Sequence, residues 1–102
     1  MLEIKFDNMA GYDAAIFLTG DLNSTTVASF NERVLPMMDD AGKKVRLDLA
    51  SLEFISSAGL RSLLLLKKTL ASKGGSLEVV NIQPPIRKVF DLTGFTRLLE
   101  IA

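Results

Sequence analysis

The sequence of 102 residues contains neither cysteine nor histidine. Without cysteine the chain cannot form disulfide bonds, present a thiolate nucleophile or bind a metal through sulfur. Without histidine it also lacks the commonest general base, the commonest zinc ligand and the acceptor of a histidine phosphorelay. The classes of function that depend on these two side chains are thereby excluded.

An excess of charge of one sign is absent as well. Twelve Lys and Arg residues balance twelve Asp and Glu residues, so the formal net charge at pH 7 is zero. A balanced chain has no electrostatic grip on nucleic acid or on an anionic membrane. The first residues, MLEIKFDN, lack the basic start and apolar run of a signal peptide, and no stretch approaches transmembrane length. We therefore expect a cytoplasmic protein without a nucleic-acid or membrane partner.

What is present is the composition of an ordinary globular domain. Hydrophobic residues make up 48% of the chain and charged residues 24%, which is typical of a folded protein and not of a disordered one. A chain of this length is expected to fold as one domain, residues 1–102, and to bury roughly 65% of its unfolded surface. We find no internal repeat, low-complexity tract or linker.

The stretch from Asp48 to Lys68 organises the chain. Apolar and polar residues alternate over residues 44–49, which predicts a strand that closes near Asp48 and is followed by a short loop. From Leu60 onward the leucines recur with helical spacing. Between the two patterns, Ser56 and Ser57 offer hydroxyl oxygens to the unpaired N–H groups of a helix N-terminus. The pattern therefore predicts a strand, a loop and a helix that opens at the serine pair.

The remaining patterns predict further strands and helices on either side. Apolar residues indicate strands at 2–6, 14–18 and 77–82. A first helix is expected to follow Ser24 as its N-cap, to be interrupted at Pro36 and to stop at Gly42. Its apolar face would consist of Val27, Phe30, Val34 and Met38. A short third helix is expected to open at Pro84-Pro85 and to end at Gly94, followed by a last short strand or a docked segment formed by Leu98, Leu99 and Ile101.

This order of elements predicts an α/β fold. Helices between strands imply crossovers and mostly parallel pairing, with an antiparallel N-terminal strand as an option. We expect one mixed sheet of four or five strands with the helices packed on one face. In such sheets, ligands and partners meet the fold at the carboxyl ends of the strands. Ser56 and Ser57 belong to that rim, together with Asp21 and Asn23 at the end of the second strand.

Ser57 is the strongest candidate for a functional residue, and three roles are open to its hydroxyl group. As a nucleophile it lacks support, because the chain has no G-x-S-x-G elbow, no histidine and no Ser-x-x-Lys arrangement at either serine. As a helix N-cap, either serine would contribute about 1 kcal/mol. As a phosphate acceptor, Ser57 would carry about −1.5 to −2 charges at pH 7 beside the positive end of a helix dipole.

The motif D-L-A-S-L-E-F-I-S-S-A-G-L-R at 48–61, preceded by G-D-L-N at 20–23, resembles the STAS domain of bacterial anti-sigma factor antagonists. The resemblance spans nearly the whole chain and implies a STAS-like single domain. It also implies phosphorylation of the serine two residues before the glycine, here Ser57. The implied partners are an anti-sigma factor that is also a serine kinase, which binds ATP and Mg²⁺, and a phosphatase. Unphosphorylated antagonist would bind the kinase and free the sigma factor, and phosphorylated antagonist would release the kinase.

The resemblance also implies a partner-binding surface. It consists of Asp21, Asn23, Ser56, Ser57, Ala58, Gly59, Leu60 and Arg61. Many members of the family carry aspartate where this chain has Ser56, so Ser56 is a second choice for modification. From residue chemistry alone, Asp21 and Asn23 are turn formers, and Asp48 is expected to accept hydrogen bonds from loop N–H groups. Arg61, Leu65 and Lys68 share a helix face that is either solvated or used for docking.

The protein is thus expected to be a non-enzymatic binding module without a cofactor or metal of its own, and a monomer when free. Two alternatives stay open. One is a constitutive scaffold of the same fold, such as a subunit of a lipid-transport complex, in which Ser57 is never modified. The other is a small hydrolase or ligand binder that uses the serines at the sheet rim.

Overall fold

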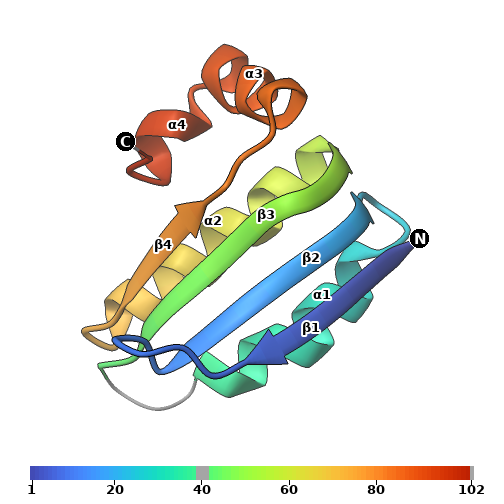
Figure 1. The fold of residues 1–102 in the computed structure, drawn as a ribbon. Helices are drawn as coiled ribbons and strands as arrows, with labels where there is room; N and C mark the ends of the chain where they lie inside the picture. The colour runs from blue at the N-terminus through green and yellow to red at the C-terminus, as the bar shows by residue number, and fades with distance from the viewer. Residues whose placement is uncertain (39–41, 102) are drawn as a thin grey trace.

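A computed structural model describes residues 1–38 and 42–101, which form one sheet with helices (Figure 1). The strands are β1 (Leu2–Asp7), β2 (Ala14–Leu22), β3 (Lys44–Ile55) and β4 (Ser76–Val80). The helices are α1 (Val27–Val34), α2 (Ser57–Ser72), α3 (Pro84–Thr93) and α4 (Phe95–Leu98), and a 3₁₀ turn, η1 (Leu35–Met38), extends α1. The Met38 side chain and residues 39–41 and 102 lie outside the description.

The sheet has four strands in the order β1-β2-β3-β4. β1 pairs with β2 antiparallel, whereas β2–β3 and β3–β4 are parallel. Helices α1 and α2 lie behind the sheet, and α3 and α4 lie beyond the carboxyl end of β4 (Figure 1). This confirms the predicted α/β fold with a mixed, mostly parallel sheet.

The core fills the space between the sheet and the helices. In β1 and in the first half of β3, alternate apolar residues are buried or half-buried, as the pleat requires. On the helix side, leucines of α2 and Phe30 of α1 are buried in the core. Phe90 of α3 is buried at the end of the sheet. The largest fully buried side chains are Phe30, Phe90, Ile16, Leu18, Leu22, Leu47, Leu49, Leu52, Leu63, Leu66 and Leu70. Of the residues that gave the helical spacing, Leu60 and Leu63 are buried and Leu64 is half-buried, and Leu66 and Leu70 complete the face of α2 that packs on the sheet.

Strand β3 is longer than its sequence pattern predicts. The pattern predicts a strand that closes near Asp48 and then a loop, but β3 continues to Ile55. The extension is held by β2, which itself runs past Leu18 and pairs Leu22 with Ile55. Two register shifts in this pairing disturb the alternation of apolar and polar residues that sequence reading relies on. The predicted loop is wrong, and Ser56 follows the strand directly.

The helix boundaries show which local signals dominate. Ser24 is not the N-cap of α1, because that helix begins at Val27. In the turn before the helix, it is the side chain of Asn23 that accepts hydrogen bonds from backbone N–H groups. Pro36 does interrupt the helix, which tightens there into η1. The predicted stop at Gly42 depends on residues 39–41 and lies outside the described part. Gly94 ends α3 in the left-handed conformation at φ +78, as predicted.

The C-terminal segment forms no fifth strand in the described residues. It forms the short helix α4, and Leu99 behind it is 1% exposed and packs into the core. The alternative that these residues dock on the core is therefore confirmed for Leu99 and Ile101, whereas Leu98 is 50% exposed.

Candidate functional site

The two serines at the start of α2 differ in what their hydroxyls do. Ser56 is the N-cap: its backbone is extended (φ −95, ψ 176) and its Oγ accepts from the Gly59 N–H at 3.3 Å. Its own N–H donates to the Leu22 carbonyl at 3.0 Å, which ties the cap to the end of β2. Ser57 is the first residue of the helix and is exposed. In the described chain no hydrogen bond to the Ser57 hydroxyl is found, so it is presented to solvent.

Gly59 allows this tip to lie directly on the ends of β2 and β3. A Cβ atom at position 59 would stand 2.5 Å from the Leu22 carbonyl oxygen and 2.8 Å from Cγ1 of Ile55. Any side chain would therefore push the helix tip away from the sheet. Leu60, which follows, is 2% exposed and packs into the core. These two residues support Ser57 from beneath, whereas Ala58 is half-buried and Arg61 is exposed.

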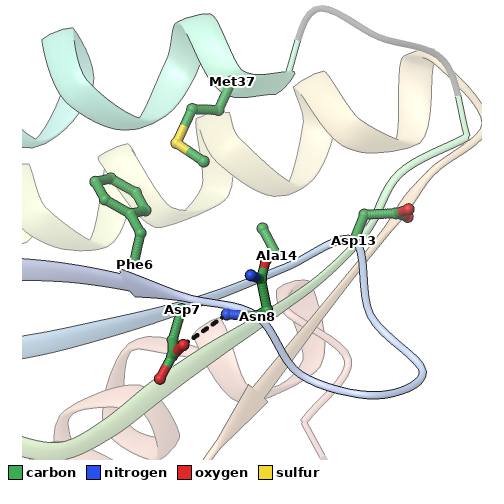
Figure 2. A pocket seen from close by; sticks show the side chains of 6 residues that line it. All are labelled: Phe6, Asp7, Asn8, Asp13, Ala14 and Met37. Atoms are coloured by element: carbon green, nitrogen blue, oxygen red, sulfur yellow. Dashed lines mark hydrogen bonds between the residues drawn. The ribbon is translucent and has the colours of Figure 1, made fainter.

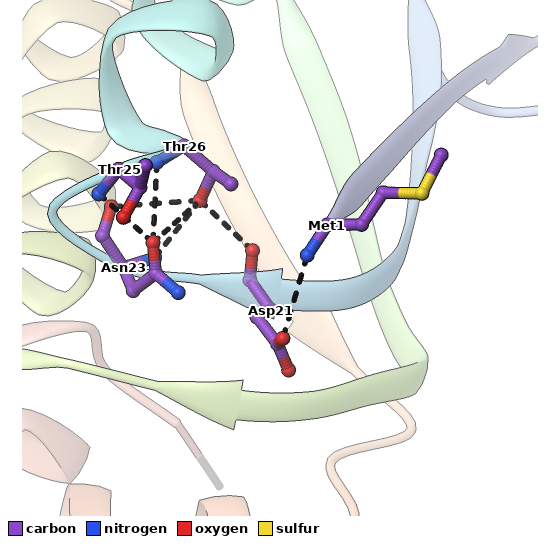
Figure 3. A network of polar contacts seen from close by, with 5 residues as sticks. All are labelled: Met1, Asp21, Asn23, Thr25 and Thr26. Atoms are coloured by element: carbon purple, nitrogen blue, oxygen red, sulfur yellow. Dashed lines mark hydrogen bonds and ion pairs between the residues drawn. The ribbon is translucent and has the colours of Figure 1, made fainter.

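Asn23 organises the neighbouring part of the rim, between β2 and α1 (Figure 3). Its Oδ1 accepts from the N–H groups of Thr25 at 2.9 Å and Thr26 at 3.2 Å. The Thr26 hydroxyl donates to the Asp21 carbonyl at 2.9 Å, and the Asp21 carboxylate lies 3.5 Å from the amino group of Met1. The expectation of a turn former is confirmed for Asn23, whereas Asp21 lies within β2 and contributes only its backbone carbonyl to the turn.

Parallel pairing brings Asn23 and the serine pair to the same edge. Leu22 is the register partner of Ile55, so the chain leaves β2 at Asn23 and leaves β3 at Ser56 on adjacent strands. The structure thus places the predicted partner-binding residues along one rim, although Gly59 and Leu60 face inward.

An exposed aromatic residue at this rim was missed by sequence reading. Phe54 is 52% exposed and is the register partner of Asp21. Because a loop was predicted there, nothing distinguished Phe54 from the inward-facing apolar residues around it. Arg61, Leu65 and Lys68 are exposed on α2. Arg61, one helical turn from Ser57, is therefore the exposed basic residue of α2 nearest to Ser57 in sequence.

The carboxylate of Asp48 has a structural role, because both of its oxygens accept hydrogen bonds. The side chain is 9% exposed, Oδ1 accepts from the Ala50 N–H at 2.8 Å, and Oδ2 accepts from Nδ2 of Asn81 at 2.8 Å. The predicted acceptor role is confirmed, except that Ala50 belongs to the strand and not to a loop. No group of three or more acidic residues that could hold a metal is found within 1–38 and 42–101.

A cleft of about 230 Å³ lies near the opposite end of the sheet (Figure 2). It lies between the β1–β2 turn and η1 and is lined by Phe6, Asp7, Asn8, Asp13, Ala14 and Met37. Asp7 Oδ1 accepts from the N–H of Asn8 at 2.8 Å. β2 carries Ala14 at one end and Leu22 at the other, so about 26 Å of strand separates the cleft from the serine rim. The cleft is no part of that rim.

Comparison with known proteins agrees with the geometry. The pattern of the family described as "Mlab, STAS domain" matches residues 6–100. BtrV of Bordetella bronchiseptica, assigned as an anti-sigma factor antagonist, is 35% identical over 99% of this chain and 86% of its own. An anti-sigma factor antagonist of Mycobacterium paratuberculosis superposes with a TM-score of 0.82 at 21% identity, over 95% of this chain and 81% of that one.

A further solved structure is the phosphorylated form of the Bacillus cell fate determinant SpoIIAA. It superposes with a TM-score of 0.70 at 19% identity, over 94% of this chain and 87% of that one. The same fold also occurs in transporters.

The chain belongs to the STAS domain family, and its named relatives are anti-sigma factor antagonists. The family resemblance and the fold predicted from sequence are thereby confirmed. Among the described residues, no helix is long and apolar enough to span a bilayer.

Proposed function

We propose that this protein is an anti-sigma factor antagonist switched by phosphorylation of Ser57. Unphosphorylated, it binds an anti-sigma factor that is also a serine kinase and thereby frees the sigma factor. Phosphorylated, it releases that partner, and a phosphatase restores the first state. ATP and Mg²⁺ belong to the kinase, and this chain itself catalyses nothing. The observation that carries the proposal is the exposed, unengaged hydroxyl of Ser57 at the start of α2.

The choice of Ser57 over Ser56 rests on their hydrogen bonds. The Ser56 oxygen accepts from the Gly59 N–H, so transfer of a phosphoryl group to it would remove the cap from α2. The Ser57 hydroxyl makes no hydrogen bond within the described residues, and it is accessible to a kinase. The existence of a phosphorylated form of SpoIIAA supports the proposal, because that protein has the same fold.

The physical basis of the switch is a difference between two free energies. A phosphate on Ser57 sits at the positive end of the α2 dipole, where an anion gains about 0.3–1 kcal/mol. Burying the same charge without a counter-ion under a docked partner costs on the order of 2–5 kcal/mol. The domain therefore tolerates the phosphate, whereas the complex does not. A loss of roughly 30- to 4000-fold in affinity follows.

The docking surface proposed for the kinase is the rim around Ser57. It comprises the exposed and half-buried residues Asp21, Asn23, Ser56, Ser57, Ala58 and Arg61, held in place by Gly59 and Leu60. Phe54 extends it with an exposed apolar side chain, and buried aromatic residues often dominate binding energy in interfaces.

The test is phosphorylation by the kinase encoded nearby, followed by mass mapping of the modified residue in three proteins. The unaltered protein and Ser56→Ala are expected to gain one phosphate on residue 57, and Ser57→Ala is expected to gain none. Phosphorylation of Ser57→Ala on Ser56 would move the switch to the neighbouring residue. If none of the three proteins is modified and all bind the kinase alike, a constitutive scaffold function replaces the proposal.

A further inference from the structure

We infer that a phosphate on Ser57 is bound in cis by the guanidinium of Arg61, one helical turn further along α2. The inference rests on the proposed function, because it requires Ser57 to carry a phosphate. It assigns to Arg61 a role in the modified state, beyond that of a contact for the partner.

The spacing of the two residues on α2 places them on one face of the helix. Ser57 and Arg61 are four residues apart, and both are exposed. Side chains on a helix lean toward its N-terminus, so the long side chain of Arg61 is directed back over the first turn. An anion four residues before a cation is also the more favourable order for such a pair.

The same spacing already supports an ion pair elsewhere in this chain. In α3, Arg87 Nε lies 3.4 Å from Asp91 Oδ1 at positions i and i+4, although the cation there precedes the anion, which is the less favourable order. In α2, by contrast, no carboxylate lies within ion-pair distance of Arg61 among the described residues, and the first turn of the helix contains no acidic residue. The guanidinium of Arg61 is therefore available, and no acidic side chain of that turn competes with a phosphate for it.

Phosphate is a stronger partner for arginine than a single carboxylate is. Arginine donates from several N–H groups at once, and two of them can bond two phosphate oxygens in parallel. A phosphoserine facing an arginine gains charge-assisted hydrogen bonds of this kind. Phosphorylation would then change two features of the rim together: it adds about −1.5 to −2 charges at Ser57, of which one arginine balances only one, and it withdraws the cation of Arg61 from a docking partner.

The test is a ³¹P NMR pH titration of protein with phosphoserine encoded genetically at position 57. Three backgrounds are compared at low ionic strength: unaltered, Arg61→Gln and Lys68→Gln. The Lys68→Gln variant is a matched control, because it removes one positive charge from an exposed position of the same helix, eleven residues from Ser57. Both substitutions leave the buried core untouched.

If Arg61 binds the phosphate, its removal makes the second phosphate ionisation harder. The second pKa of the phosphoserine is expected to rise by about 0.3–0.7 unit in Arg61→Gln and by less than about 0.1 unit in Lys68→Gln. The difference between the two variants should shrink in about 1 M salt, which screens exposed charges beyond about 3 Å. Equal titration of Arg61→Gln and the unaltered protein would overturn the inference.

This titration requires no kinase, so its result is independent of the proposed switch. If the second pKa of the phosphoserine does not change in Arg61→Gln, the contact with Arg61 is refuted, and the proposed switch is still tested separately by the affinity for the kinase. A clear shift together with unchanged partner binding would support the contact and refute the switch.

Discussion

Replacing Gly59 with alanine tests whether the tip of α2 is seated on the strands as described. The added Cβ would stand 2.5 Å from the Leu22 carbonyl oxygen, so reaching 3.0 Å requires a shift of at least 0.5 Å. The obstacle is backbone, and its oxygen already accepts from the Ser56 N–H. The helix tip therefore has to move, because the carbonyl is held in place.

Two opposing terms set the size of the effect. Overpacking of this kind costs about 1–3 kcal/mol, and a contact with fixed backbone belongs at the upper end. Alanine in place of glycine favours a helix by about 1 kcal/mol. The net loss of unfolding free energy is expected to be about 2 kcal/mol, which corresponds to a fall of about 8 °C in Tm for a domain of this size.

The assay is thermal and urea unfolding followed by circular dichroism, with Ser57→Ala as the control in the same helical turn. Ser57 is exposed and makes no side-chain hydrogen bond in the described residues, so its replacement is expected to change stability by less than about 0.5 kcal/mol. A Gly59→Ala protein as stable as the unaltered one, or more stable, would show that helix propensity outweighs the contact and would refute the described seating.

Three further predictions concern stability. Ser56→Ala is expected to lower the free energy of unfolding by about 0.5–1 kcal/mol, because it removes the hydrogen bond from the Gly59 N–H to the cap. Urea unfolding of this variant and of Ser57→Ala measures the difference. Equal stability of the two variants would contradict the assignment of Ser56 as the cap. Ser62→Ala is expected to lower the free energy of unfolding by about 0.5–1.5 kcal/mol, because the buried hydroxyl donates to Asn31 Oδ1 at 2.5 Å and so joins α2 to α1. Stability that is restored by threonine but not by valine at position 62 would confirm the hydrogen bond. Asp48→Ala is expected to lose about 1–2 kcal/mol, because both carboxylate oxygens accept hydrogen bonds; a loss below about 0.5 kcal/mol in the same assay would refute this role.

Local signals predicted the parts of the fold that local interactions decide. The leucine spacing of α2, the serine at its start and Pro84 and Gly94 at the two ends of α3 each act within a few residues. Their helices were therefore predicted correctly. The preference for Ser57 as the free serine came from the family resemblance, and the hydrogen bond of Ser56 gives it a separate physical reason.

The features that sequence reading missed depend on contacts between distant segments. The second half of β3 is a strand because β2 pairs with it, which the polar residues Ser51 and Glu53 do not reveal. The hydrogen bond between Ser62 and Asn31 joins α2 to α1 through two residues that are 31 positions apart in the sequence. The exposure of Phe54 could not be predicted either, because it depends on the pairing of β3 with β2, in which Phe54 is the partner of Asp21. Ser24 was predicted as the N-cap because serine is a good capping residue, but the N-cap is Thr26 and Asn23 bonds the turn before it, which only the geometry of the turn decides.

The central claim is that one phosphate on Ser57 is tolerated by the free domain and rejected by the docked partner. The most direct measurement is the affinity of the cognate kinase for the unmodified protein and for protein with phosphoserine encoded at position 57, by calorimetry without ATP. The account predicts a loss of roughly 30- to 4000-fold on phosphorylation, with the two free proteins unfolding within about 1 kcal/mol of each other. Equal affinities of the two forms would contradict it.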